Sequence, residues 1–193
     1  MYRITKVLNH NATLAQNLDD GQENLVVGKG VGFGKKPGQR LEFASGVTVY
    51  QLSQKCDRGD PRDLVKRIDP VYLGIANSIL LRAKEVFGSV DTSILIPMAD
   101  HIAFAAQRIR KHSALSNPLT SDIRALFAQE FAVAREGGRM IEQQTGVHFS
   151  DDELGYIALH IHSALESMQV SQAMQTARII RECVDLVQRA AGV

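Results

Sequence analysis

The sequence predicts a two-domain protein of the β + α class, in which a small four-stranded antiparallel sheet precedes an all-α bundle of five helices. Two observations carry this prediction. Residues 1–52 alternate short β-branched runs with turn residues, which is typical of strands. Beyond residue 61 the apolar residues recur at helical spacing, and the segments begin with capping residues. We therefore expect a first domain at 1–55, a polar linker with Gly and Pro at 56–63, and a helical domain at 64–193.

Turn residues divide the first domain into four strands. Asn9-His10-Asn11, Asp19-Asp20-Gly21 and Lys36-Pro37-Gly38 are typical of tight turns. The strands expected around them are 2–8, 12–18, 23–27 and 43–52. A domain of about fifty residues buries little apolar surface, so self-association would stabilise it.

Capping residues mark the five helices of the second domain. Asp69-Pro70 is expected to start a helix that Gly88 ends, and Gly146 is expected to stop a later one. Ser150 and Glu153 have the spacing of a capping box at the start of the fourth helix. Four of the five helices are expected at about 70–87, 91–112, 117–144 and 171–190, and the remaining one starts at the Ser150 box and bears His160 and His162.

The most distinctive segment is the run Gly-Lys-Gly-Val-Gly-Phe-Gly-Lys-Lys at residues 28–36. Glycine on alternate positions packs poorly in a helix or a core strand, but it lets a partner approach the backbone closely. Phe33 adds a stacking face and the three lysines add positive charge. These properties suit nucleic acid, especially single-stranded or loop RNA. A plain exposed turn is an equally good interpretation of the run taken alone.

Nucleotide-binding motifs are excluded by the spacing of the same glycines. Neither Gly-Lys step is followed by Ser or Thr, as a Walker loop requires, and the dinucleotide pattern Gly-x-Gly-x-x-Gly is absent from the run. The net charge is only +1, with +2 on residues 1–52 and −1 on the remainder. A nucleic-acid partner would therefore have to be held by specific contacts or by a dimer, because the overall field is weak.

His101 and His160 each lie in an apolar stretch with helical periodicity. A partly buried, hydrogen-bonded imidazole is the simplest interpretation of either residue. His160 and His162 are two positions apart, so they point in different directions on a helix, and no cysteine cluster accompanies them. A metal-dependent hydrolase using the three histidines is thus a weaker alternative. Reversible phosphorylation, which would add charge to a bundle groove or interface, is the functional interpretation that remains.

Four separated motifs, in order, resemble the BglG/SacY/LicT family of transcriptional antiterminators. They are Lys6-Val7-Leu8-Asn9-His10-Asn11, the glycine run, Asp100-His101-Ile102-Ala103-Phe104 with Gln107-Arg108, and Gly155-Tyr156-Ile157-Ala158-Leu159-His160-Ile161-His162. The glycine run and the His-Ile-His ending look most like the family member of a glucose operon.

The resemblance implies a co-antiterminator RNA-binding domain followed by a regulation domain of the phosphotransferase system. Such proteins bind a hairpin in the leader mRNA as homodimers and prevent the terminator from forming. The phosphoacceptors implied are His101 and His160, supported by Asp100, Arg108 and His162. The RNA-binding residues implied are Lys6, Asn9, His10, Asn11, Gly28, Lys29, Gly30 and Phe33.

The implied partners are a glucose-type enzyme II and HPr, which would act as phosphoryl donors. The resemblance implies no enzymatic activity and no cofactor for the chain itself. A signalling adaptor that accepts phosphate but binds protein instead of RNA is the alternative. Asn9-His10-Asn11 departs from the three asparagines frequent in the family. Family members also carry a second regulation domain, which would follow Val193. No apolar run suits a membrane span or a signal peptide, and Cys56 and Cys183 are typical of reduced thiols, which favours the cytoplasm.

Overall fold

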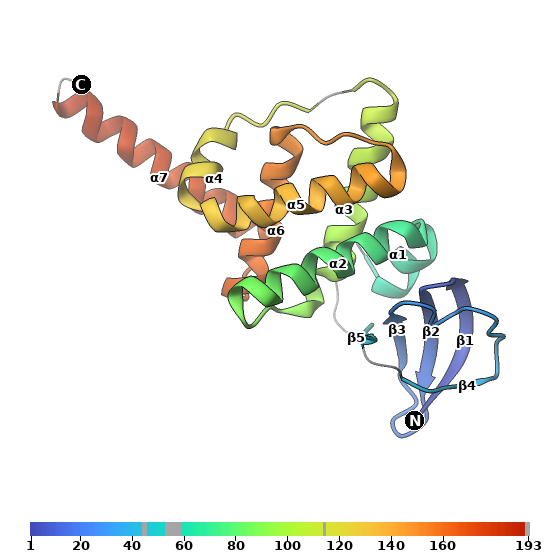
Figure 1. Ribbon diagram of the computed structural model, residues 1–193. Coiled ribbons are helices and arrows are strands. Elements are labelled where there is room, and N and C mark those ends of the chain that lie inside the picture. Colours follow the sequence, from blue (N-terminus) through green and yellow to red (C-terminus); the bar gives the residue numbers. More distant parts are fainter. Residues whose placement is uncertain (44–45, 53–58, 114, 192–193) are drawn as a thin grey trace. The chain divides into compact units, whose positions relative to one another are not determined.

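The computed structural model describes residues 1–43, 46–52, 59–113 and 115–191, and it confirms the order of a β-sheet followed by helices (Figure 1). The chain forms two compact units. The first comprises Met1–Ser78 with Leu95–Phe104, and the second comprises Ile79–Ile94 with Ala105–Val193. Two long helices, α2 (Pro70–Phe87) and α3 (Leu95–Arg110), each contribute residues to both units.

The sheet has five antiparallel strands in the order β4-β1-β2-β3-β5. The prediction of four strands is wrong because Arg40 and Leu41 add a short edge strand beside Tyr2 and Arg3. Two residues are too few to show a period of two, so the sequence pattern does not reveal this strand. The last strand is also shorter than the predicted range 43–52, of which 44–45 lie outside the described residues. The strands are β1 (Tyr2–Asn9), β2 (Ala12–Asn17), β3 (Glu23–Val27), β4 (Arg40–Leu41) and β5 (Thr48–Gln51).

The strands β2 and β3 are buried on both faces within the first unit. One face carries an apolar cluster of Ile4, Ala15, Val26, Val31 and Leu41. On the other face Leu14, Leu25 and Tyr50 are register partners across three strands, and each is at most 5% exposed. The Tyr50 hydroxyl donates a hydrogen bond of 2.6 Å to Oδ1 of Asn77 on α2. The central strands therefore consist almost wholly of buried residues, without the polar alternation of a solvent-facing sheet.

The described residues contain seven α-helices and one 3₁₀ turn, where five helices are predicted. One addition is α1, which begins inside the predicted linker 56–63 and is capped by Asp60, whose side chain accepts from the Arg62 amide. Residues 56–58 of that linker lie outside the described residues. The second addition arises because the predicted helix 117–144 breaks at Phe127, where φ is −122° and ψ is 51°. The elements are α1 (Pro61–Arg67), α2 (Pro70–Phe87), η1 (Thr92–Ile94), α3 (Leu95–Arg110), α4 (Thr120–Leu126), α5 (Ala128–Thr145), α6 (Asp151–Glu166) and α7 (Val170–Ala191).

Most predicted helix ends are confirmed, but the capping box is wrong. Asp69 Oδ1 accepts from the Val71 amide at 3.0 Å, and Gly146 ends α5 in the left-handed conformation. Ser150 is the N-cap of α6, yet its side chain makes no capping hydrogen bond. Glu153 is 1% exposed and forms an ion pair with Arg108 instead. A buried carboxylate needs a charged or hydrogen-bonding partner, and here a guanidinium from another helix supplies it.

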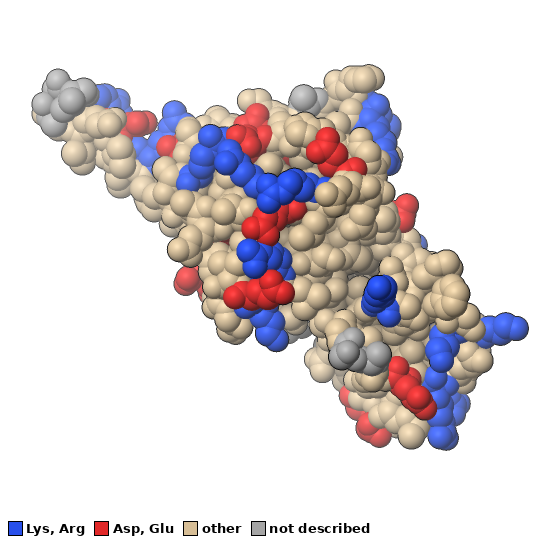
Figure 2. Space-filling view, in the orientation of Figure 1, with Lys and Arg blue, Asp and Glu red and all other residues tan. Residues whose placement is uncertain are grey.

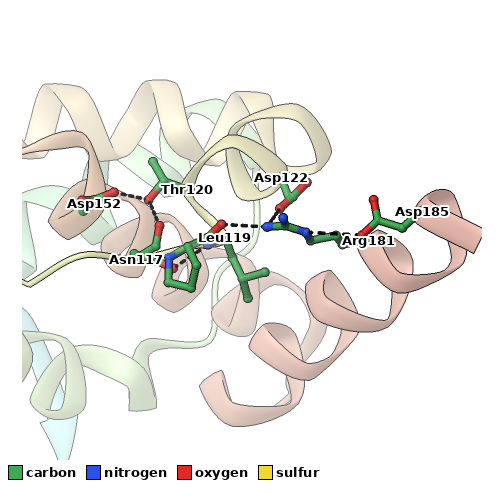
Figure 3. A network of polar contacts seen from close by, with 8 residues as sticks. Asn117, Leu119, Thr120, Asp122, Asp152, Arg181 and Asp185 are labelled. Carbon is green, nitrogen blue, oxygen red and sulfur yellow. Dashed lines mark hydrogen bonds and ion pairs between the residues drawn. The ribbon is translucent and has the colours of Figure 1, made fainter. Parts of the chain in front are cut away.

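A polar network ties α7 to α4 and α6 in the second unit (Figure 3). The Thr120 hydroxyl lies within hydrogen-bonding distance of the Asn117 carbonyl oxygen and the Asp152 carboxylate. Arg181 on α7 donates to the Pro118 carbonyl at 2.9 Å and to Asp122 at 3.3 Å. These contacts fix the start of α4 against its neighbours without a side-chain cap.

None of the helices in the described part of the chain is long and apolar enough to cross a membrane. Cys183 is a free, exposed thiol on α7, and Cys56 lies outside the described residues.

Tyr50→Phe is expected to lower the free energy of unfolding by about 1–3 kcal/mol, because it leaves the buried Asn77 carbonyl oxygen without its donor. Urea unfolding of the whole chain measures this difference. Tyr2→Phe, which alters a partly buried ring on the same sheet, is the matched control and should change little. Equal stabilities of the Tyr50 variant and the unmodified chain would contradict the contribution of this hydrogen bond.

The same variant should also change how stability depends on pH. Burial raises the pKa of Tyr50 well above its usual value, with a smaller opposing effect from a hydrogen bond with Thr48. Because the folded pKa exceeds the unfolded value of about 10, the contribution of Tyr50 is complete below pH ~10 and is lost as the pH rises further. The stability difference between the unmodified chain and Tyr50→Phe should therefore shrink above pH ~10.

Candidate nucleic-acid interface and histidine sites

Two loops at one end of the sheet are joined by backbone hydrogen bonds. The turn between β1 and β2 contains Asn11, whose carbonyl oxygen accepts from the Gly28 amide at 2.9 Å. The side-chain Oδ1 of Asn11 accepts from the Gly30 amide at 2.8 Å. The Gly32 amide in turn donates to the His10 carbonyl at 2.9 Å. The glycine run and the Asn9-His10-Asn11 turn thus form one surface.

Two positions of the run require glycine, because neighbouring atoms lie too close for a side chain. A Cβ on Gly32 would lie 2.2 Å from the carbonyl oxygen of Asn9, and a Cβ on Gly28 would lie 2.8 Å from the Val47 side chain. Gly30 has open space around it but a φ of +73°, which disfavours other residues. The glycines therefore shape the loop against the turn.

Phe33 lies at the exposed tip of this surface. Its side chain is 68% exposed, although a large aromatic ring gains stability when it is buried. The edge of the His10 ring meets it at 5.3 Å between centroids, with an angle of 83° between the planes. Beside the pair, Asn9, His10 and Asn11 line an open hollow of about 310 Å³. The arrangement offers an accessible stacking face next to polar side chains.

The lysines predicted to contact RNA are all exposed. Lys29 lies in the loop itself, and Lys6 lies on β1 opposite Leu14 of β2. Figure 2 shows blue side chains gathered along the border of the sheet that carries β1 and β4, with two smaller acidic patches beside them. The structure therefore gathers seven of the eight predicted residues at the joined surface, with Asn9 at the end of β1, and places Lys6 further back on the same strand.

The two predicted phosphoacceptors lie in different compact units. His101 is in the part of α3 that belongs to the first unit, and both it and Asp100 are half-buried. His160 lies on α6 in the second unit and is 7% exposed. Neither imidazole is fully exposed, so each is held within its own packed environment.

His162 has partners that the sequence analysis missed. Its Nδ1 lies 2.9 Å from Oε1 of Glu130, in the first turn of α5. Its ring stacks on Phe127 with 4.0 Å between centroids and 29° between planes. Both partners are more than 30 residues away in sequence, so no local pattern could have revealed them.

Arg108, the other predicted supporting residue, pairs with the buried Glu153 in the second unit. Both groups are largely shielded from water, with 18% and 2% of their side chains exposed. One turn further along α6, burial raises the pKa of Tyr156 and the Glu153 carboxylate adds to this effect. Arg108 is thus committed to a buried ion pair within the second unit. No group of His, Cys, Asp and Glu in the described ranges is arranged to hold a metal ion.

The chain thus combines two modules. A small antiparallel sheet carries an exposed, glycine-shaped loop surface suited to nucleic acid, and the helices that follow carry half-buried and buried histidines. Comparison with known proteins agrees with this combination. Residues 2–57 match the CAT RNA binding domain, and residues 75–164 match the PRD domain.

Several relatives of this chain carry the name GlcT, the glucose-operon member that the motifs indicate. Protein GlcT of Staphylococcus haemolyticus (strain JCSC1435) is 31% identical over 189 residues, and that of Staphylococcus aureus (strain Newman) is 29% identical over 191 residues. The alignments cover 97% of this chain but 66% of each relative. A solved structure, the crystal structure of GlcT CAT-PRDI, matches with a TM-score of 0.71 and 29% identity, covering 85% of this chain and 98% of that chain.

The chain therefore belongs to the BglG family of transcriptional antiterminators, with a CAT RNA-binding domain followed by a PRD domain. The chain spans 66% of the length of the curated relatives that it matches.

Gly32→Ala is expected to lower the free energy of unfolding by about 1–3 kcal/mol, because the new methyl group would meet the Asn9 carbonyl oxygen and force the two loops apart. Gly34→Ala is the matched control, since Gly34 has a φ of +65° but no neighbour within 4 Å and should lose only about 1 kcal/mol. Thermal unfolding compares the two variants. A smaller loss for Gly32→Ala than for Gly34→Ala would contradict the close contact.

Proposed function

We propose that this chain binds a hairpin in a leader mRNA as a homodimer and prevents the overlapping terminator from forming, under the control of histidine phosphorylation in its PRD domain. The observation that carries this proposal is the joined loop surface, where an exposed aromatic ring stands beside amide and lysine side chains. Stacking and hydrogen bonding at unpaired bases are the main means by which proteins recognise RNA loops.

In this proposal each group on the surface has a separate task. Phe33 stacks on an unpaired base, and Asn9, His10 and Asn11 face base edges across the hollow that they line. Lys6 and Lys29 meet phosphates. Gly28 and Gly30 let the loop approach the RNA backbone.

The proposed phosphoacceptors are His101 and His160. Asp100 is proposed to orient the imidazole next to it, and Arg108 and His162 to support the site on α6. A glucose-type enzyme II of the phosphotransferase system would be the donor, with HPr as a second source. Each phosphoryl group adds about −1.5 to −2 charges, which the half-buried or buried positions of these imidazoles would convert into a change of packing.

We also propose the boundaries 1–55 for the RNA-binding domain, 56–63 for the linker and 64–193 for the regulation domain. The chain acts in the cytoplasm, where the nascent mRNA and the phosphotransferase proteins are found, as a regulator and not as an enzyme. The family matches at 2–57 and 75–164 support this division.

Phe33→Ala is expected to weaken binding of the leader hairpin by about tenfold or more, because stacking of a base on an aromatic ring contributes ~1–3 kcal/mol. Adding Asn11→Ala should weaken it further, since the Gly30 amide loses its acceptor. A gel-shift titration of the full chain measures both effects. Phe43→Ala, which removes another exposed ring on the same unit, is the control. Unchanged binding by the double variant would contradict the proposal that the joined loop surface binds RNA.

His101→Asp, which places a negative charge at the proposed phosphoacceptor, is expected to lower the affinity for the hairpin. His148→Asp provides the control, because that imidazole is 77% exposed and lies outside the proposed sites. Circular dichroism of both variants verifies that each is folded. Tighter binding by His101→Asp would reverse the sign proposed for phosphorylation.

Phosphopeptide mapping after incubation with enzyme I, HPr and a glucose enzyme II should find phosphate on His101 or His160. Phosphotransfer to a chain with no RNA affinity at any salt concentration would instead favour an adaptor that binds protein.

A further inference from the structure

The amide groups of Asn9 and Asn11 are held in one orientation by the loop itself. Oδ1 of Asn9 accepts from the Asn11 amide at 2.8 Å, and Oδ1 of Asn11 accepts from the Gly30 amide at 2.8 Å. Each side-chain oxygen is therefore turned toward the protein backbone. The NH₂ group is on the opposite branch of a planar amide, so in both residues it is turned away from that backbone contact.

The two NH₂ groups are left for a ligand. Within residues 1–43, 46–52, 59–113 and 115–191, neither Nδ2 donates a hydrogen bond, and both residues line the open hollow beside Phe33. Lys29 in the adjoining loop adds an ammonium group, which also only donates. Apart from the His10 imidazole, the side-chain groups that this surface presents for hydrogen bonding are thus donors.

A donor surface distinguishes between the bases. An asparagine that binds adenine at two points needs its oxygen for the N6 amino group and its NH₂ group for N7, and here the oxygen is turned toward the loop backbone. Guanine presents two acceptors, O6 and N7, side by side on the corresponding edge, whereas cytosine presents an amino donor there. The guanine edge matches a pair of NH₂ groups without requiring any acceptor from the protein.

We propose that the surface selects an unpaired guanine, which stacks on Phe33 and turns its O6/N7 edge toward the amide nitrogens of Asn9 and Asn11. This inference rests on the proposed RNA-binding function and assigns the base that the site recognises. It also assigns two roles to Asn11, because its oxygen shapes the loop while its nitrogen faces the RNA. The exposed Phe33 ring accepts any base by stacking, so the selection comes from the amides.

The test begins with in vitro selection of RNA from hairpins with a randomised internal loop, using the full chain. The selected RNA is then transcribed with occasional 7-deazaguanosine, which lacks the N7 acceptor, and bound and free fractions are compared. Binding should be reduced about fivefold or more when the substitution falls on one unpaired guanine. The same experiment with 7-deazaadenosine should show no such position.

Asn11→Asp separates the two roles of the side chain, because the carboxylate still accepts from the Gly30 amide but has no NH₂ group. The added negative charge will lower the affinity for RNA, so the readout is the pattern of RNA positions at which 7-deazaguanosine reduces binding. The sensitivity at that guanine should disappear. Asn17→Asp is the matched control, since Asn17 Oδ1 accepts from the Asp19 amide in a similar turn, and it should keep the pattern.

Failure of the inference and failure of the proposed function give different results. If no RNA is enriched by the unmodified chain, RNA binding itself is wrong. If RNA is enriched but no unpaired guanine is sensitive, or if sensitivity falls on an adenine, the assignment of guanine is overturned and RNA binding stands. Retention of the pattern by Asn11→Asp would overturn the role of the Asn11 nitrogen.

Discussion

The surface at the end of the sheet depends on the hydrogen bonds that Asn11 accepts from the Gly28 and Gly30 amides. A glycine-rich segment has high conformational entropy when unfolded, and it becomes a defined surface only when its amides have fixed acceptors. One asparagine supplies two such acceptors, through its backbone and its side chain. The exposed Phe33 and the orientation of the neighbouring amides follow from this arrangement, because the loop that carries them is anchored to the strand turn beside it.

The strands β2 and β3 beneath this surface are buried on both faces, which gives the loops a rigid support. Ile4 and Val26 pack on one side, and Leu14 and Leu25 are buried on the other, where Tyr50 binds Asn77 of α2. Asn77 lies within the range that matches the PRD domain, and Tyr50 lies within the range that matches the CAT domain. The first compact unit thus joins elements of both domains, and it includes the part of α3 that carries His101.

The histidines show how similar sequence settings acquire different environments. His101 is half-buried on α3, His160 is almost fully buried on α6, and His162 is paired with Glu130 and stacked on Phe127. The sequence placed all three on helices, but their partners come from other helices. The same holds for Glu153, whose spacing from Ser150 predicted a capping box and whose carboxylate instead reaches Arg108. The spacing of residues in the sequence shows which side chains are neighbours on one helix. A buried charged group such as Glu153 is paired with a residue of another helix, which that spacing does not show.

The sequence by itself determined the class of the fold, the β-then-α order, most turns and helix ends, and the family, because these depend on local backbone preferences and on contiguous motifs. It missed Arg40–Leu41, the break at Phe127 and the helix after Asp60, which are too short or too dependent on packing to leave a periodic pattern. The predicted binding residues were named from motifs, and the sequence could not show that Asn11 holds Gly30 across 19 positions. Only the tertiary structure decided which polar atoms form hydrogen bonds within the protein and which face outward. Hydrogen-bond partners distant in sequence are fixed by the packing of the whole chain.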